Sequence, residues 1–255
     1  MTDVTRRLAA LATAAPDALV ANVLAATGTG RYYSTVDGPT GELLIGWSRA
    51  GIYAVAPMTE ETRFLEEHST GPLAPIPREL PAKWHRQVVA ALRSGKLGPL
   101  PVDLSTLSEF QRAVLRKTAE IPPGQLRPYG WVAREIGKPG ATRAVGSALN
   151  KNPVPVLIPC HRVGRSDGTV GQYAYGPRMK RDLLRAEGLD PDAIDDAAER
   201  GVRYIGSATT NIYCHPTCHH AKRIEEANRV ELRSAAAAHR AGFRACLVCR
   251  PAIAA

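Results

Sequence analysis

The five cysteines of this 255-residue chain fall into two groups with different chemistry. Cys160 stands alone and is followed directly by His161, whereas the other four cysteines lie between positions 214 and 249. An ordinary thiol has a pKa of about 8.5, so it needs a neighbouring base or positive charge to act as a nucleophile at neutral pH. A histidine held by a carboxylate is the usual base. The pair therefore indicates a nucleophilic thiol, against the alternative of a small buried core residue.

The four remaining cysteines have the spacing of metal ligands. Cys214 and Cys218 form one close pair, Cys246 and Cys249 form a second, and 27 residues separate the pairs. Two such pairs predict a closed tetrahedral site for one zinc ion. No organic cofactor is expected. Because four thiolates complete the zinc shell, three nearby histidines are expected to be surface groups: His219, His220 and His239.

Positive charge is concentrated around both cysteine groups. The net charge is +9; residues 108–190 carry 14 basic and 7 acidic side chains, and residues 201–255 carry 8 and 3. Clustered lysine and arginine are typical of a phosphate-binding surface. Charge alone leaves nucleic-acid binding and simple solubility equally open.

The first part of the chain predicts a small antiparallel sheet with helices. Residues 5–28 are rich in alanine and predict one or two helices. Strand-like runs at 32–36, 43–47 and 52–55 are separated by short turns and predict a three-stranded meander. Residues 82–92 predict an amphipathic helix.

The middle of the chain predicts the helices that must position Cys160. A helix is expected from 108 to about 120. Short helices at 129–136 and 141–149, joined by a glycine-containing turn, predict a helix-turn-helix unit. Three prolines within 153–159 exclude a helix and predict an extended segment. A last helix is expected at 178–187, ended by a glycine.

The segment around Cys160 resembles the O6-alkylguanine-DNA alkyltransferases, whose hallmark is a Pro-Cys-His-Arg-Val run, here residues 159–163. Supporting motifs occur in the order of that family: Phe110-Gln111, Tyr129-Gly130, Arg143-Ala144-Val145-Gly146, Asn152-Pro153, Leu183-Leu184 and Glu187-Gly188. The resemblance covers about residues 30–190. It implies a methylated-DNA–protein-cysteine methyltransferase that moves an alkyl group from damaged DNA to its own thiol. Because a thioether has no easy route back to a thiol, it also implies a single turnover.

The resemblance implies roles for four residues at this site. Cys160 is expected to accept the alkyl group, and His161 to act as its base through a water molecule. Glu187 is expected to hold the imidazole, and Asn152 to brace the site. The expected substrate is O6-alkylguanine in double-stranded DNA, with O4-alkylthymine as a second candidate.

A damaged base must leave the duplex before a protein can act on it. By resemblance, Arg143 fills the space that the base vacates, Tyr129 pushes on the 3′ phosphate and Tyr173 forms a wall of the base pocket. Arg162 is expected to belong to the same DNA-contacting group.

The C-terminal segment, residues 205–251, resembles a second family, the Ada-type zinc modules. The matching residues are Thr209-Thr210, Ile212-Tyr213-Cys214, Pro216, Cys218, Asn228-Arg229-Val230, Ala241-Gly242-Phe243-Arg244, Cys246 and Cys249-Arg250-Pro251. In that family one zinc-bound thiolate accepts a methyl group from a methyl phosphotriester of the DNA backbone. By position this acceptor is Cys214, and Arg244 is a candidate phosphate contact.

Two interpretations of this module stay open. Methylating one thiolate removes a negative charge, so the methylated module should bind DNA more tightly. The alternative is a purely structural zinc site, as most four-cysteine sites are. In the Ada arrangement the zinc module comes first and precedes a transcription-activating domain. Because the order is reversed here, we expect no direct transcriptional control.

The predicted fold class is α/β of the α+β kind, with a small antiparallel sheet, a helical alkyltransferase domain with its helix-turn-helix, and a small zinc-stabilised module. The expected parts are residues 1–104 with the sheet, 105–190 for DNA binding and catalysis, 191–203 as an acidic linker, and 204–255 as the zinc module.

Sequence also bounds location and partners. The apolar runs are too short to cross a bilayer and no secretory signal is visible, so a cytoplasmic protein without a membrane partner is expected. The expected partner is DNA carrying alkyl lesions, bound by a monomer.

The alternative to a repair enzyme is an alkylation-damage sensor whose zinc module recruits partners or DNA. A zinc regulator with a decayed alkyltransferase domain is a third reading, which the intact site residues disfavour.

Overall fold

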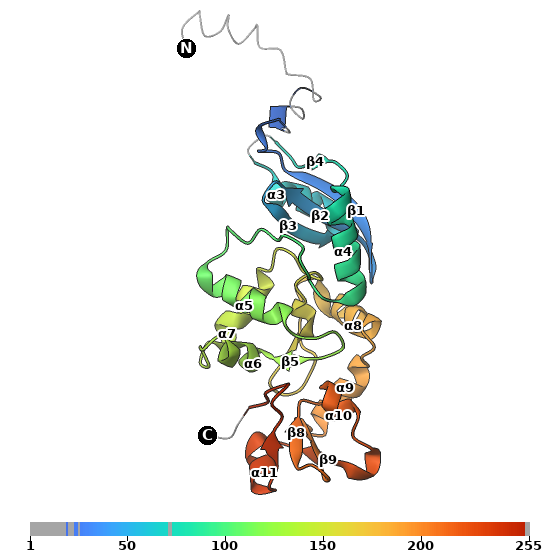
Figure 1. The fold of residues 1–255 in the computed structure, drawn as a ribbon, viewed down its shortest axis with the longest axis vertical. Helices are drawn as coiled ribbons and strands as arrows, with labels where there is room; N and C mark the ends of the chain where they lie inside the picture. Colours follow the sequence, from blue (N-terminus) through green and yellow to red (C-terminus); the bar gives the residue numbers. More distant parts are fainter. Residues whose placement is uncertain (1–18, 20–22, 25, 71–72, 253–255) are drawn as a thin grey trace, which may run out of the picture.

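The N-terminal part contains a four-stranded sheet and the helices α3 and α4 (Figure 1). The computed structural model describes residue 19, residues 23–24, 26–70 and 73–252. The helical prediction for residues 5–28 lies mostly outside these residues. The elements are β1 (Tyr32–Gly38), β2 (Gly41–Ser48), β3 (Gly51–Pro57), the 3-10 turn η1 (Met58–Glu60), α3 (Glu61–His68), β4 (Ile76–Pro77) and α4 (Ala82–Ser94).

The strand order is β3-β2-β1-β4, and the first three strands form the predicted antiparallel meander. The short β4 pairs in parallel with β1. The turn into β3 requires glycine at position 51, where φ is 137° and an added Cβ would lie 2.7 Å from the Pro101 carbonyl oxygen. That carbonyl accepts a hydrogen bond from Ile52, so the segment before residue 104 packs along β3.

The middle part is helical and carries the helix-turn-helix unit. Its elements are α5 (Glu109–Ala119), β5 (Arg127–Pro128), α6 (Tyr129–Glu135), α7 (Thr142–Asn150), the 3-10 turn η2 (Cys160–Arg162), β6 (Val163–Gly164), α8 (Gly176–Ala186) and α9 (Pro191–Glu199). Helix α5 begins in a capping box, in which Ser108 and Gln111 bond each other's backbone N–H groups. The predicted helices are confirmed, and α8 begins two residues earlier than expected.

One hydrophobic core joins the sheet to the helices. Ile52 of β3, Val114 of α5, Val145 of α7 and Cys160 of η2 belong to the same cluster of buried side chains. The nucleophile candidate therefore sits on a packed framework, which limits its movement.

The segment 153–159 corrects the prediction of an extended chain. It contains no helix, as expected, but it reverses direction in a tight turn, in which Ile158 donates a backbone hydrogen bond to Val154 and Leu157 to Pro155. Val156 adopts a φ of 69°, a conformation that costs energy for a β-branched residue. Prolines exclude a helix, but they also favour turns, and the turn delivers Cys160 into the core.

The C-terminal module is a second small sheet around the four cysteines. Its strand order is β10-β8-β7-β9. The elements are β7 (Tyr204–Ser207), β8 (Ile212–Cys214), α10 (His219–Lys222), the 3-10 turn η3 (Glu226–Asn228), β9 (Arg229–Leu232), α11 (Ala235–Arg240) and β10 (Arg244–Ala245). Figure 1 shows this module beyond α6 and α9, at the end of the molecule opposite the first sheet.

The segment predicted as an acidic linker contains the helix α9. Asp190 caps it by accepting hydrogen bonds from two backbone N–H groups, and Pro191 occupies its first turn. Its carboxylates pair with α8, because Arg181 binds Asp192 and Asp195. Acidic side chains here anchor a helix to the neighbouring one.

Candidate active site and metal centre

Cys160 begins η2 and is 7% exposed. The Asn152 amide donates one hydrogen bond to the Cys160 sulfur at 3.2 Å and another to the Ile158 carbonyl at 3.0 Å. The Asn152 side-chain oxygen accepts from the Val154 backbone N–H at 3.1 Å. Both polar atoms of the Asn152 side chain thus hold the sulfur and the turn before it.

His161 and Glu187 form a hydrogen-bonded pair next to this thiol. His161 Nε2 lies 2.9 Å from Glu187 Oε1, and the imidazole is almost fully buried. Because the Glu187 carboxylate accepts a hydrogen bond from the Nε2–H group, Nδ1 is the free acceptor of a neutral ring. Nδ1 is buried and has no protein hydrogen-bond partner among the described residues.

Burial keeps the thiol and the imidazole of this pair neutral at rest. Burial raises the pKa of Cys160, although hydrogen bonding by Asn152 and the charge of Lys180 partly offset it. Burial lowers the pKa of His161, again partly offset by Glu187. Burial also works to raise the pKa of Glu187, but hydrogen bonds from His161 and Arg162 prevail and lower it to about 2. The site therefore holds a neutral thiol, a neutral base and an ionised carboxylate.

Arg162 does not lie where the resemblance placed it. Its side chain is 1% exposed, and its Nε and one terminal nitrogen bind Glu187 at 2.7–3.0 Å. The other donors reach the Ile121 carbonyl at 2.7 Å and the Gly95 carbonyl at 2.8 Å. The predicted DNA contact of Arg162 is wrong for this structure, because the guanidinium is enclosed. It is the buried counter-ion of Glu187 instead.

Lys180 is a buried cation beside the site that sequence reasoning missed. Its ammonium donates to the Val163 carbonyl at 2.6 Å and to the Gln172 carbonyl at 3.1 Å. Burial lowers its pKa to about 8, and the Cys160 charge would raise it. The available signal was a lysine on the apolar face of α8, in helical register with Leu183 and Leu184.

The other predicted site residues differ in how deeply they are buried. Arg143 is exposed in the first turn of α7, whereas Tyr129 begins α6 and is half-buried. The Tyr173 ring meets the His161 ring edge-on at 6.4 Å between centroids, and the Tyr175 ring at 6.0 Å. The Tyr173 hydroxyl has no well-formed hydrogen bond within the described chain, although it is close enough to the thiol for each to affect the other's pKa.

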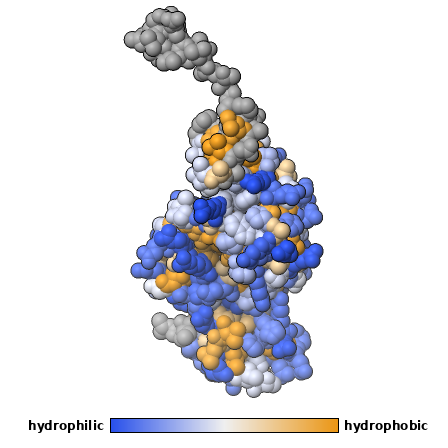
Figure 2. All heavy atoms as spheres, turned by 45° about the horizontal axis from the view of Figure 1, so that its top comes forward, coloured by the Kyte–Doolittle hydropathy of each residue, from blue (hydrophilic) through white to orange (hydrophobic). Residues whose placement is uncertain are grey.

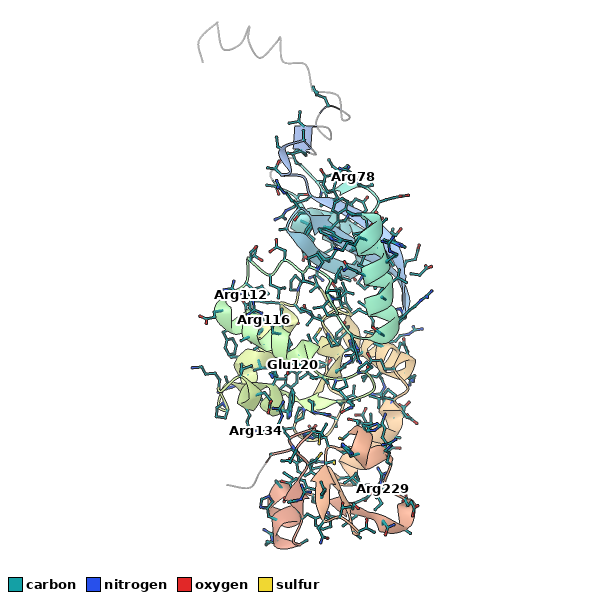
Figure 3. All side chains as sticks on the ribbon, viewed as in Figure 1. Arg78, Arg112, Arg116, Glu120, Arg134 and Arg229 are labelled. Carbon is teal, nitrogen blue, oxygen red and sulfur yellow. The ribbon has the colours of Figure 1, made fainter. Side chains whose placement is uncertain are left out.

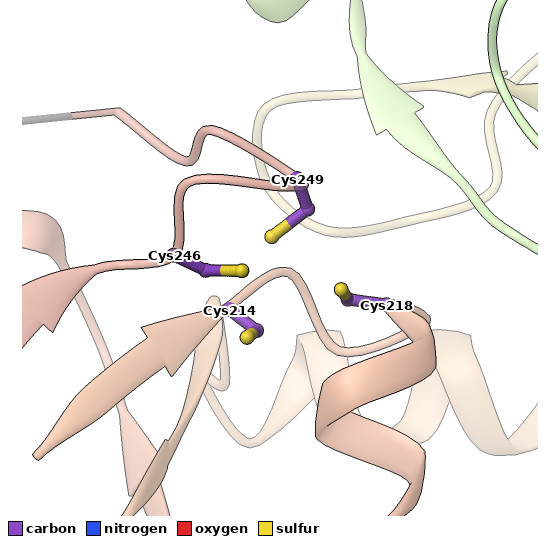
Figure 4. Close-up of side chains that lie close together, drawn as sticks. All are labelled: Cys214, Cys218, Cys246 and Cys249. Atoms are coloured by element: carbon purple, nitrogen blue, oxygen red, sulfur yellow. The ribbon is translucent and has the colours of Figure 1, made fainter. Parts of the chain in front are cut away.

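The four cysteines of the module point toward one another (Figure 4). Their sulfur atoms all lie within 4.8 Å of each other, and all four residues are buried. A tetrahedral zinc ion with Zn–S bonds of about 2.3 Å needs sulfurs roughly 3.8 Å apart, so the set fits zinc. The Cys249 sulfur also accepts a hydrogen bond from the His215 backbone N–H at 3.4 Å. His219, His220 and His239 are exposed, as predicted.

Arg127 brings a buried positive charge to this centre from the helical part of the chain. It is 2% exposed, and its guanidinium lies 5.7 Å from the centre of the Trp131 ring. Burial lowers the pKa of Arg127, whereas the four cysteine charges raise it. A zinc ion with four thiolates carries net negative charge, which this arginine partly compensates. Nothing in the surrounding sequence indicated that role.

A cavity of about 580 Å³ opens beside the metal centre. Cys214 and the basic side chains of Arg223 and Arg244 line it. Leu247 and Val248, at 82% and 63% exposure, lie at its edge. Figure 2 shows apolar groups gathered on this module below a mostly hydrophilic middle. Cys214 and Cys246 are the two ligands that line this cavity, whose charged side chains are those of Arg223, Arg244 and Glu225.

Fold and site together define a class of protein: a helix-turn-helix unit with a buried cysteine beside a histidine–carboxylate pair, joined to a four-cysteine metal module. The family model for the DNA-binding domain of 6-O-methylguanine DNA methyltransferase matches residues 109–189, and that for the metal-binding domain of Ada matches residues 193–252.

Individual relatives agree with the two models. The methylated-DNA–protein-cysteine methyltransferase of Methanosarcina barkeri is 34% identical over 166 residues, which cover 61% of this chain and 96% of that protein. The bifunctional transcriptional activator/DNA repair enzyme Ada of Escherichia coli is 36% identical over 159 residues, which cover 61% of this chain and 45% of Ada. The crystal structure of Mycobacterium tuberculosis OGT in complex with DNA is 28% identical, with a TM-score of 0.51, and covers 66% of this chain and 98% of that one.

The chain therefore belongs to the methylated-DNA–protein-cysteine methyltransferases and carries an Ada-type zinc-binding module. The predicted family, fold class, enzyme class and zinc cofactor are confirmed, and DNA is its partner. Within the described ranges, no helix is both long enough and apolar enough to span a bilayer.

Proposed function

We propose that Cys160 accepts the alkyl group of O6-alkylguanine, and of O4-alkylthymine, from duplex DNA. The observation that supports this most is the arrangement of neutral thiol, neutral imidazole and ionised carboxylate around Cys160. A thiol that is protonated at rest stays unreactive until a base removes its proton. The free Nδ1 of His161 is that base, acting through a water molecule.

The transfer is a single displacement. His161 takes the proton of Cys160, and the thiolate attacks the alkyl carbon. The new carbon–sulfur bond forms as the carbon–oxygen bond to the base breaks, and the electron pair stays on the guanine oxygen. The proton then moves from His161 to the guanine. The thiol and the alkylguanine have become a thioether and guanine. Glu187 stabilises the transient imidazolium, and Asn152 holds the sulfur in line.

The base reaches this site only when it leaves the duplex. Arg143 is exposed at the start of the second helix of the helix-turn-helix and is suited to fill the vacated stack. Tyr129, at the start of the first helix, is suited to contact the 3′ phosphate. Tyr173, which packs against His161, is suited to form one wall of the pocket.

Mass mapping after exposure to damaged DNA tests this proposal. A duplex with one O6-methylguanine should add one methyl group to the peptide that contains Cys160 and to no other cysteine peptide. A tenfold excess of the duplex should leave nine-tenths of the lesions unrepaired, because each molecule reacts once. Repair of more lesions than protein molecules would refute the single-use mechanism.

We also propose that Cys214 accepts a methyl group from methyl phosphotriesters. The supporting observation is the cavity beside this ligand, which Arg223 and Arg244 line together with one carboxylate, Glu225. Bound zinc would keep all four sulfurs as thiolates. The Cys214 thiolate attacks the methyl carbon, the carbon–oxygen bond breaks and the electron pair restores an anionic phosphate. The module loses one negative charge and should then bind DNA more tightly.

Replacing Arg244 tests the second acceptor. Arg244 is exposed and lines the cavity, so Arg244→Ala should slow methylation of Cys214 by about tenfold on a duplex with one methyl phosphotriester, the effect of losing one charged hydrogen bond. Arg240→Ala, an exposed arginine of α11 outside the cavity, is the matched control and should react as wild type. If wild-type, zinc-loaded protein leaves Cys214 unmodified, the zinc centre is structural only.

A further inference from the structure

The zinc module is joined to the alkyltransferase part by hydrogen bonds that start next to the metal ligands. The Trp131 indole N–H of α6 donates to the Cys249 carbonyl at 2.9 Å. The Thr217 hydroxyl, one residue before Cys218, accepts from the Leu126 backbone N–H at 2.7 Å and lies 3.3 Å from the Leu126 carbonyl. Both ligand pairs are therefore anchored to the same framework that carries Cys160.

The border between the two parts is visible in the side-chain view. Arg134 of α6, labelled in Figure 3, lies beside the C-terminal module and donates to the Arg250 carbonyl at 3.0 Å. In return, the Arg250 guanidinium pairs with Glu135 at 2.6 Å. These contacts fix the module against the helix-turn-helix, so a structural change in one part can alter the structure of the other.

One contact leads directly to the nucleophile site. The Lys222 ammonium donates to the Gly124 carbonyl at 3.0 Å. The backbone N–H of the same Gly124 donates to Glu187 Oε2 at 2.9 Å. Glu187 in turn holds His161 through its other oxygen. A single residue thus lies between the zinc module and the carboxylate of the proposed triad.

Gly124 can make both contacts because of its conformation. Its φ is 65°, and an added Cβ would lie 2.8 Å from the Glu187 backbone oxygen. Only glycine fits this close approach without strain. The close packing means that the Gly124 peptide cannot shift without disturbing Glu187.

The position of Lys222 depends on the metal ligand Cys218. It ends the four-residue helix α10, which begins directly after Cys218, and its backbone N–H donates to the Cys218 carbonyl at 3.0 Å. Lys222 is exposed, so its position depends on α10 more than on side-chain packing. A helix this short is not stable by itself, so Cys218 and its metal hold it in place.

We propose that Lys222 is a positioning residue for alkyl transfer to Cys160, so that the folded zinc module completes the alkyltransferase site. This inference rests on the proposed role of Cys160. Lys222 keeps the Gly124 N–H aimed at Glu187, and Glu187 keeps His161 oriented for proton transfer. The zinc module then assists base repair even when no phosphotriester is present.

The test compares three full-length, zinc-loaded variants with wild type. Lys222→Met keeps the side-chain length and removes the ammonium, Lys222→Arg keeps a donor, and Arg240→Met is an exposed control in the same module. The readout is the single-turnover rate of methyl transfer to Cys160 from a duplex with one O6-methylguanine. Zinc content, melting temperature and DNA affinity are measured alongside.

Lys222→Met should transfer about threefold to tenfold more slowly, the effect of losing one hydrogen bond, with unchanged zinc content and DNA affinity. Lys222→Arg should retain most of the rate, and Arg240→Met all of it. Chelating the zinc of wild type should slow transfer at least as much. Chelation should slow transfer by a smaller factor in Lys222→Met than in wild type. Both changes break the same hydrogen bond, the one from Lys222 to Gly124.

The pH dependence of the transfer rate distinguishes a Lys222 that positions Glu187 from a Lys222 that only holds the zinc module in place. The charged groups that face His161 are Glu187, Arg162 and Lys180, and Glu187 raises the pKa of His161. When Glu187 is held less firmly, it raises the pKa of His161 less. Because His161 must be neutral to accept the proton, the fall of the transfer rate on the acidic side should then move to lower pH. A Lys222→Met protein that melts earlier but keeps the wild-type rate and profile overturns the inference alone. A wild-type protein that does not methylate Cys160 overturns the proposed function as well.

Discussion

Cys160→Ala is expected to abolish methyl transfer from O6-methylguanine while leaving DNA binding intact. The sulfur is the atom that forms the new bond, and no neighbouring group can replace it, since Asn152 and Tyr173 are weak nucleophiles. The side chain is small and packs inside the core, so its loss should cost about 1 kcal/mol of stability and leave the fold unchanged. Transfer is followed by loss of methyl from labelled duplex, and binding by fluorescence anisotropy.

The same variant separates repair from damage sensing. A sensor needs only to recognise the lesion, so Cys160→Ala would keep its function. A repair enzyme would keep lesion binding but leave the methyl group on the DNA. Cys160→Ser is the companion variant, because it keeps a polar atom for Asn152 and should still transfer at least a thousandfold more slowly. Undiminished methyl removal by Cys160→Ala would contradict the assignment of the nucleophile.

The arrangement of both cysteine groups was predictable because it depends on residues close together in sequence. Cys160 and His161 are adjacent, and each metal-ligand pair spans one turn, so spacing carries the information. The three strands and most helices were predictable for the same reason, since alternation and helical periodicity are local signals. The turn at 153–159 was not, because proline is compatible with both extended and reversed chains.

Contacts between distant segments left no such signal. Trp131 and Cys249 are 118 residues apart, and Lys222 and Gly124 are 98 apart. Most of these contacts end on backbone carbonyls, which every residue has, so no residue type reveals the partner. Arg162 shows the converse error: its place in the hallmark motif suggested DNA, but its buried guanidinium is the counter-ion of Glu187.

Glu187→Gln is expected to reduce the transfer rate by about a thousandfold or more. The amide removes the negative charge that stabilises the imidazolium, and its NH₂ group can hold His161 in the wrong tautomer. The change also leaves the Arg162 guanidinium buried without a counter-ion, which should cost about 3–5 kcal/mol of unfolding free energy. Single-turnover transfer measures the first effect and urea unfolding the second.

The matched control is Glu199→Gln, which removes an exposed carboxylate at the end of α9 and should change neither quantity. Glu187→Asp keeps the charge but shortens the side chain, so it should transfer faster than Glu187→Gln and more slowly than wild type. If Glu187→Gln, confirmed to be folded by circular dichroism at the assay temperature, transfers at the wild-type rate, Glu187 is no part of the proton path.

The stability difference between wild type and Glu187→Gln should depend on pH with a defined sign. The pKa of Glu187 is about 2 in the folded protein, against an ordinary value of 4.5. A carboxyl group whose pKa is lowered by folding adds stability that is fully present above its unfolded pKa and disappears as the pH falls through its folded pKa. The difference should therefore be largest above about pH 5 and narrow between 4.5 and 2. A difference that does not change over this window would show that Glu187 acts through packing and not through its charge.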